Sequence, residues 1–170
     1  VKNWISDIPL NVKKVGVFVD EKIENIHNIA GELNLDFIQL HGGESSEYCD
    51  KMIKPVIKVF RVGDDFDSTV LKDYQVAAFL FDTYKKGELG GTGENFNWEL
   101  IAELKTDTPI ILSGGLNSVN ILNGINVVNP SAVDVNSGVE SAPGIKDERK
   151  VENIFTKLEN TNGNGKLFQR

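Results

Sequence analysis

Six short runs of apolar, largely β-branched residues are spaced along the chain, and the segments between them carry apolar residues at helical spacing. The runs begin at Val15, Phe37, Val56, Ala77, Pro109 and Ala132. Nearly continuous apolar runs are typical of strands that are buried on both faces of a parallel sheet. The intervening segments have the 3.6-residue period of amphipathic helices. This regular alternation predicts a parallel α/β fold.

Each run ends in a polar or glycine-rich segment, and these ends supply the first candidates for a functional site. The polar residues at the run ends include Asp20, His41, Arg61, Asp82, Ser113 and Asp134. Carboxyl ends of parallel strands form the functional rim of α/β folds, so we expect these side chains to converge there. Asp134 stands out because it interrupts the buried run "AVDV", where an unpartnered carboxylate is costly. A helix cap or a satisfied hydrogen bond in the core would also explain it.

Two glycine-rich loops follow the last two runs, in "SGGLNS" and "NSGVE", and contain Gly114, Gly115, Ser137 and Gly138. Glycines let backbone N–H groups approach an anion, so the pair predicts a phosphate site, although either loop alone is explained equally well by a turn. In (β/α)8 barrels the phosphate commonly lies on the loops after strands 7 and 8. We therefore expect residues 1–159 to form part of a TIM barrel and to supply strands 3 to 8.

The two ends of the chain bear on this strand count. Val1, Trp4, Ile5 and Ile8 have helical spacing with no start signal before them, as at the end of a helix that begins earlier. A complete open sheet of six strands is the alternative, and this orphan helical pattern disfavours it. Residues 160–170 are rich in Asn and Gly and predict a tail or linker.

Composition excludes several classes of function. The chain has 170 residues and a formal charge of −7, which argues against a nucleic-acid or anionic-membrane surface. No apolar window is long enough to span a membrane, so we expect a cytoplasmic protein. A single cysteine excludes an internal disulfide, and no Cys/His cluster has metal-ligand spacing. Only three arginines are present, so backbone N–H groups must hold much of any bound phosphate.

Several motifs together resemble one enzyme family, phosphoribosylanthranilate isomerase of tryptophan biosynthesis. The matching stretches are "VGVFVD", "LDFIQLHGGE", "FLFDT", "GGTGENFNW", "ILSGGLNSVNI" and "VDVNSGVESAPGIKD". The resemblance implies an intramolecular aldose–ketose isomerisation. N-(5-phosphoribosyl)anthranilate becomes 1-(2-carboxyphenylamino)-1-deoxyribulose 5-phosphate by an Amadori rearrangement, with no cofactor and no metal. A small phosphoribosyl compound is then the substrate.

The resemblance also implies roles for individual residues. Asp134 matches the family's general acid, which would protonate the ribose ring oxygen, and His41, Asp82 and Arg61 are expected to contact the substrate. Each of the three has a plain structural alternative: a hydrogen-bonded rim histidine, a helix cap and a neighbouring ion pair. Gly90, Gly91 and Gly93 form either a lid over the substrate or an irregular turn.

The chain departs from the family at its front. Members begin with a strand reading like "KICG", whose cysteine is the general base, and carry an arginine in an "SPR"-like loop, whereas this sequence starts after both. Cys49 lies in a helix-like segment and is expected in the core instead. We therefore expect the isolated chain to be inactive and to need the N-terminal segment, or a fused pathway enzyme, as its partner.

Two alternatives stay open. A non-catalytic barrel fragment is one. The other is another phosphosugar barrel such as indole-glycerol-phosphate synthase, which is disfavoured because it relies on lysines at strand ends, and Lys58 is the only lysine expected in a strand here.

Overall fold

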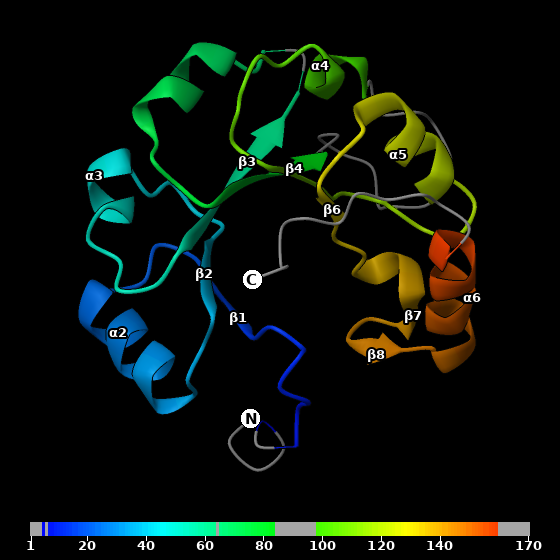
Figure 1. The fold of residues 1–170 in the computed structure, drawn as a ribbon, viewed down its shortest axis with the longest axis horizontal. Coiled ribbons are helices and arrows are strands. Elements are labelled where there is room, and N and C mark those ends of the chain that lie inside the picture. The colour runs from blue at the N-terminus through cyan, green and yellow to red at the C-terminus, as the bar shows by residue number, and fades with distance from the viewer. Residues whose placement is uncertain (1–4, 6, 64, 84–97, 160–170) are drawn as a thin grey trace. The chain divides into compact units, whose positions relative to one another are not determined.

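Strands and helices alternate along the chain as the hydrophobic pattern predicts (Figure 1). The computed structural model describes residue 5 and residues 7–63, 65–83 and 98–159. The elements are β1 (Val15–Phe18), α2 (Ile23–Glu32), β2 (Phe37–Leu40), α3 (Ser46–Cys49), β3 (Val56–Val62), the 3-10 helix η1 (Ser68–Asp73), β4 (Ala78–Thr83), α4 (Glu99–Ala102), β5 (Ile110–Leu112), α5 (Ile121–Val128), β6 (Ala132–Val133), the 3-10 helix η2 (Ser137–Val139), β7 (Glu140–Ala142), β8 (Ile145–Lys146) and α6 (Glu148–Glu159).

The six predicted runs form the six strands of one sheet, hydrogen-bonded in chain order from β1 to β6. Val15 of β1 pairs in parallel with Phe37 of β2, and Leu40 of β2 pairs in parallel with Lys58 of β3. β5 and β6 are parallel as well. The prediction of a parallel α/β fold is therefore confirmed. β1 is the first strand in this order, and its outer edge has no strand partner within the described ranges.

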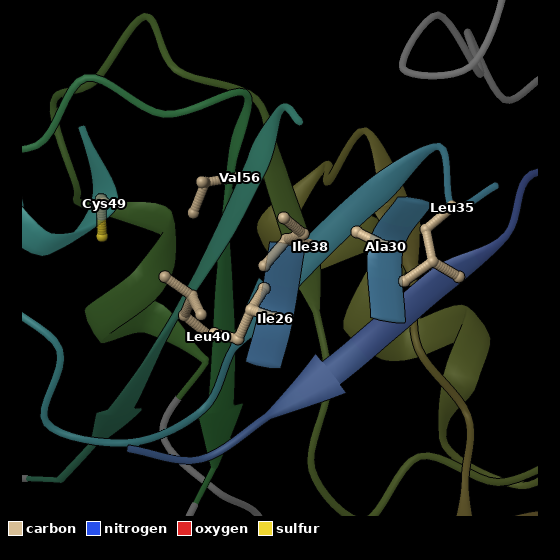
Figure 2. Close-up of a cluster of buried hydrophobic side chains, with 7 residues drawn as sticks. All are labelled: Ile26, Ala30, Leu35, Ile38, Leu40, Cys49 and Val56. Carbon is tan, nitrogen blue, oxygen red and sulfur yellow. The ribbon is translucent and has the colours of Figure 1, made fainter. Parts of the chain in front are cut away.

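The chain divides into two compact units, of which the first comprises Val1–Phe60 and Thr69–Phe79. Its core is a cluster of seven buried side chains from α2, β2, α3, β3 and the turn after α2 (Figure 2). Ile26 and Ala30 are four residues apart and lie on the same face of α2, against Ile38 and Leu40 of β2. This packing fixes where β2 ends, and the loop after β2 carries His41.

The second unit comprises Arg61–Ser68 and Leu80–Arg170. Ile121 of α5 and Ile154 of α6 share a buried cluster with Val139, at the end of η2. Gly124 lets α5 lie close to the sheet, because a Cβ at this position would meet Leu112 Cδ2 at 3.0 Å. The loops after β5 and β6 are thus anchored by helices on a well-packed core.

Two features differ from the sequence-based expectation, and further predicted segments lie outside the described residues. β7 and β8 form an antiparallel hairpin that strand periodicity missed, because the two strands have only three and two residues. The amphipathic segment around Val70 and Leu71 is a 3-10 helix rather than an α-helix. The Gly90–Gly93 loop and the tail at 160–170 lie outside the described residues, as does most of the expected N-terminal helix, of which Ile5 is described as helical.

No helix within the described ranges is both long and apolar enough to cross a membrane. The same part of the chain contains no cluster of three or more His, Cys, Asp or Glu side chains that could hold a metal ion.

Candidate active site

Asp134 and Ser113 lie side by side in the second unit, directly after two neighbouring strands. The Asp134 amide donates to the Leu112 carbonyl (2.8 Å), and the Ser113 amide donates to the Phe81 carbonyl (2.9 Å), so the sheet's hydrogen bonding continues one residue past β6 and β5. The Ser113 hydroxyl donates to Oδ2 of Asp134 at 3.1 Å. Ser113 is buried and Asp134 is half-buried. The carboxyl is therefore held at a rigid strand end rather than on a loose loop.

Asp82 and Arg61 also belong to this unit. Asp82 lies in β4 and follows Phe81, the residue whose carbonyl accepts the Ser113 amide, so a second half-buried carboxyl is one strand away from Ser113. Arg61 lies in β3 and is exposed. Neither residue caps a helix among the described elements, whereas the sequence left a cap open as the alternative for Asp82.

The two glycine-rich loops come into direct contact. A Cβ at Gly138 would meet the Leu116 carbonyl oxygen at 1.8 Å, so the loop after β6 lies against the backbone of the loop after β5 and tolerates only glycine here. Gly114 and Gly115 have φ angles of 86° and 63°, in the left-handed region that favours glycine. The loops after β5 and β6, which the sequence predicts to act as a pair, are thus adjacent.

Two asparagines that the sequence reading did not single out brace the loop after β5. The side chains of Asn117 and Asn120 donate to the Gly115 carbonyl at 3.2 and 3.1 Å. Asn120 Oδ1 also accepts the Asn117 amide at 2.8 Å, and Asn117 Oδ1 accepts the Val119 amide at 2.8 Å. Asn side chains that bond nearby backbone groups are a known turn signal, so the spacing "LNSVN" could have indicated this brace.

Lys146 ties the β7–β8 hairpin to the loop after β6. Its ammonium donates to the Asn136 carbonyl (2.9 Å), to Asn136 Oδ1 and to Glu140 Oε1 (2.8 Å). The hydrogen bond from Lys146 holds the pKa of Glu140 below its ordinary value. Lys146 lies in β8, so the expectation that Lys58 is the only strand lysine is wrong, because the hairpin was not predicted.

His41 belongs to the first unit and follows β2. Its amide donates to the Phe18 carbonyl at 2.8 Å, and its side chain is half-buried. Glu44, in the loop that follows, forms a buried ion pair with Lys58 of β3, whose Nζ lies 2.8 Å from Glu44 Oε2. Burial alone would raise the pKa of Glu44, but hydrogen bonds from Lys58 and the Asp20 amide outweigh it, so this pKa lies below its ordinary value. Glu44 was not predicted, although a lysine inside a buried strand demands an anionic partner.

Cys49 has a structural position, as the sequence predicted, and His27 has one as well. Cys49 lies in α3 within the buried cluster of the first unit, and burial raises the pKa of its thiol to about 11. A thiol of that kind is protonated near neutral pH and cannot serve as a general base. His27 lies on α2, with Nε2 3.1 Å from the Lys51 carbonyl oxygen.

Comparison with known proteins identifies one family throughout. Residues 1–157 match the family model described as N-(5'phosphoribosyl)anthranilate (PRA) isomerase. The N-(5'-phosphoribosyl)anthranilate isomerases of Thermoanaerobacter sp. strain X514 and Geobacter metallireducens are 45% and 44% identical to the chain. The alignments cover 91% and 89% of the chain and 76% and 75% of those relatives.

Solved structures of the same enzyme have the same fold. Phosphoribosyl anthranilate isomerase from Thermotoga maritima matches with a TM-score of 0.81 and 35% identity, over 94% of the chain and 79% of that structure. A second structure, in complex with reduced 1-(o-carboxyphenylamino)-1-deoxyribulose 5-phosphate, matches with a TM-score of 0.75 and 31% identity, over 94% and 78%.

Proposed function

The chain belongs to the N-(5'-phosphoribosyl)anthranilate isomerase family, and we propose the following roles for its residues in that isomerisation. The reaction opens the ribose ring of N-(5-phosphoribosyl)anthranilate and moves a proton from C2′. It therefore needs an acid at the ring oxygen and a base at C2′, and no electrons are exchanged with a cofactor.

Asp134 is the proposed general acid. Support comes from its place at a strand end and from the Ser113 hydroxyl, which donates to Oδ2 and orients the carboxyl. Within the described part of the chain, Oδ1 of Asp134 has no hydrogen-bond partner, which leaves this oxygen to carry and deliver the proton. Asp82 is the competing candidate, because it is a second half-buried carboxyl on the strand next to Ser113.

Substituting each carboxyl separately tests this assignment. The tests use the full enzyme, that is, this chain together with the two N-terminal βα units proposed below. In it, Asp134→Asn keeps the size of the side chain but removes the transferable proton. Turnover should fall by roughly 10² to 10⁴ with substrate affinity little changed. Asp82→Asn should mainly weaken substrate binding, and Asp50→Asn, at an exposed position, is the matched control. Near wild-type turnover of Asp134→Asn, together with the large loss in Asp82→Asn, would transfer the acid role to Asp82.

The loops at Gly114, Gly115, Ser137 and Gly138 are proposed to bind the substrate phosphate. Their mutual contact and the left-handed glycines support this role, because they allow backbone N–H groups to approach an anion closely. A crystal structure with the reduced product analogue should show its phosphate against these four residues. His41 and Arg61 are proposed to contact the rest of the substrate. A phosphate bound at Arg61 instead would contradict the loop assignment.

We also propose that β1 to β6 are strands 3 to 8 of an eight-stranded barrel. The support is at β1, whose outer edge has no strand partner in the described part of the chain. Val15, Val17 and Val19 alternate along this segment and are 37%, 57% and 61% exposed, although strands of parallel sheets are normally covered on both faces. Two further βα units would cover this edge and would contribute the general base, which the buried Cys49 cannot supply.

Complementation tests the strand count. Residues 1–170 expressed alone should be inactive and prone to associate, because an exposed strand edge pairs with other chains. Adding the first two βα units of the Thermotoga maritima relative, as a separate peptide or fused in front, should restore a monomer of full activity. Full activity of a verified 170-residue monomer would show that the strand count or the source of the base is wrong.

A further inference from the structure

A buried ion pair joins Glu44, in the loop that follows His41, to Lys58 of β3. Groups of the protein itself accept all the hydrogen bonds that the lysine can donate. The side chains of Lys58 and Glu44 are only 3% and 1% exposed. The Lys58 ammonium has three N–H groups and three acceptors: Glu44 Oε2 (2.8 Å), the Gly42 carbonyl (2.8 Å) and the Leu40 carbonyl (3.4 Å). No proton of this lysine is left for a substrate, so it does not act as a binding or catalytic group.

The carboxylate of the pair holds two segments together. Glu44 Oε1 accepts the Asp20 amide at 2.9 Å, and Oε2 accepts the Gly42 amide at 2.9 Å. Asp20 in turn accepts the Gly43 amide at 2.7 Å through Oδ1. The segment after β1 is thus bonded to the segment after β2 through two carboxylates. Charge-assisted hydrogen bonds of this kind are short and strong in a buried setting.

The backbone on both sides of the His41 side chain is fixed by these contacts. On the N-terminal side, the His41 amide is bonded to Phe18 of β1. On the C-terminal side, the amide of Gly42 is bonded to Glu44 and its carbonyl is bonded to Lys58. A Cβ at Gly42 would meet Asp20 Oδ1 at 2.4 Å, so a side chain here would displace the Asp20 carboxylate. The pair therefore holds the backbone directly on the C-terminal side of His41.

We propose that the Lys58–Glu44 pair is a positioning device for His41, which fixes this side chain for substrate binding without touching the substrate. The inference rests on the proposed role of His41 in substrate binding. It explains why a strand of a buried sheet contains a lysine, and why an ion pair is retained where apolar side chains would give comparable stability. Displacing a binding group by about 1 Å can cost on the order of 10²-fold in function.

The test removes both charges at once. Lys58→Met alone leaves a buried, unpaired carboxylate and risks unfolding, so the main variant is the double substitution Glu44→Gln/Lys58→Met in the full enzyme. The exposed Lys13, whose ammonium is 3.5 Å from Asp36, provides the matched control Lys13→Met. Affinity for the reduced product analogue is measured by calorimetry in the wild-type background and again in a His41→Asn background.

A positioning role predicts a strong dependence on His41. The double substitution should weaken analogue binding by roughly 10- to 100-fold when His41 is present. In the His41→Asn background it should change binding by no more than about twofold, because contacting residues are not additive. Equal losses in both backgrounds would show a merely structural role and would overturn the proposal. Lys13→Met should have no effect in either background.

A second readout observes His41 directly. The chain has two histidines, and His41→Asn and His27→Asn, made separately, assign their imidazole Cε1–H signals in the NMR spectrum of the enzyme. The double substitution should move the His41 signal and leave that of His27, on α2, unchanged. An unmoved His41 signal would overturn the proposal. Wild-type analogue affinity of His41→Asn itself would refute the substrate role of His41, and the NMR signal alone would then decide whether the pair positions this residue.

Discussion

Two lysine–glutamate pairs hold two loops of this protein by the same chemistry in different surroundings. Lys58–Glu44 and Lys146–Glu140 both have an N–O distance of 2.8 Å, and each lysine also donates to one backbone carbonyl of the loop that it holds, that of Gly42 or of Asn136. The side chains of the first pair are 3% and 1% exposed, whereas those of the second are 46% and 16% exposed. Equal geometry therefore coexists with unequal access to water.

The difference in burial decides what each pair does for the protein. Exposed ion pairs contribute little to stability, because water and salt compete for both charges. Buried pairs contribute little net stability as well. Removing only one of the two charges is strongly destabilising, however, because the other charge remains buried without a partner or solvent. Loss of one charge from the Lys58–Glu44 pair, which holds the loop with His41, should therefore cost much stability. Loss of one charge from Lys146–Glu140, which holds the loop with Ser137, should cost little.

Substituting the lysine of each pair should give the largest difference in stability between the two pairs. Lys58→Met leaves the Glu44 carboxylate buried and should lower the free energy of unfolding by about 3 to 5 kcal/mol. Lys146→Met leaves Glu140 in contact with water and should shift the unfolding curve only slightly. Urea unfolding of the full enzyme, followed by circular dichroism, measures both. Equal shifts would show that burial does not separate the two pairs.

Double substitutions serve as the control for this experiment. Glu44→Gln/Lys58→Met removes the stranded charge and should recover a large part of the stability that is lost in Lys58→Met. Glu140→Gln/Lys146→Met should differ little from Lys146→Met alone. A double variant of the buried pair that is as unstable as Lys58→Met would mean that lost packing around the Lys58 side chain, not its charge, dominates.

The sequence predicted the strands of this fold better than the groups that hold its loops. All six apolar runs became strands, because burial on both faces of a sheet leaves a clear pattern. Asp134 was found because a carboxyl is anomalous in such a run, and its partner Ser113 lies at the end of the neighbouring strand. Glu44 was missed because a polar residue in a glycine-rich loop is ordinary. Only the fold shows that it reaches the buried Lys58.

The β7–β8 hairpin was missed for a different reason. Its strands are too short to show a period of two, although Pro143 and Gly144 form a recognisable turn signal, and Gly144 has a φ of 78°. Lys146 was consequently not recognised as a strand residue. The contact between Gly138 and the Leu116 backbone likewise depends on how close the loops after β5 and β6 come, which no spacing in the sequence encodes.

Lowering the pH should also distinguish the two pairs, but by a smaller difference in the free energy of unfolding than the substitutions produce. The pKa of Glu44 lies below its ordinary value of 4.5, because hydrogen bonds from Lys58 and Asp20 outweigh the effect of burial. The unfolded chain therefore binds a proton at this site before the folded protein does as the pH falls. The stability that Glu44 contributes is fully present above pH 4.5 and is lost as the pH falls through the lower pKa of the folded state.

Urea unfolding between pH 7 and pH 3.5 measures this loss. The free energy of unfolding of the wild type should fall steeply below about pH 4.5, and Glu44→Gln should flatten part of that fall because its side chain does not titrate. The pKa of Glu140 is also lowered, by the hydrogen bond from Lys146, but its exposure to water makes the expected flattening in Glu140→Gln smaller. If Glu140→Gln flattened the curve more than Glu44→Gln, the exposed pair would be the stronger constraint, and the comparison between the two loops would be reversed.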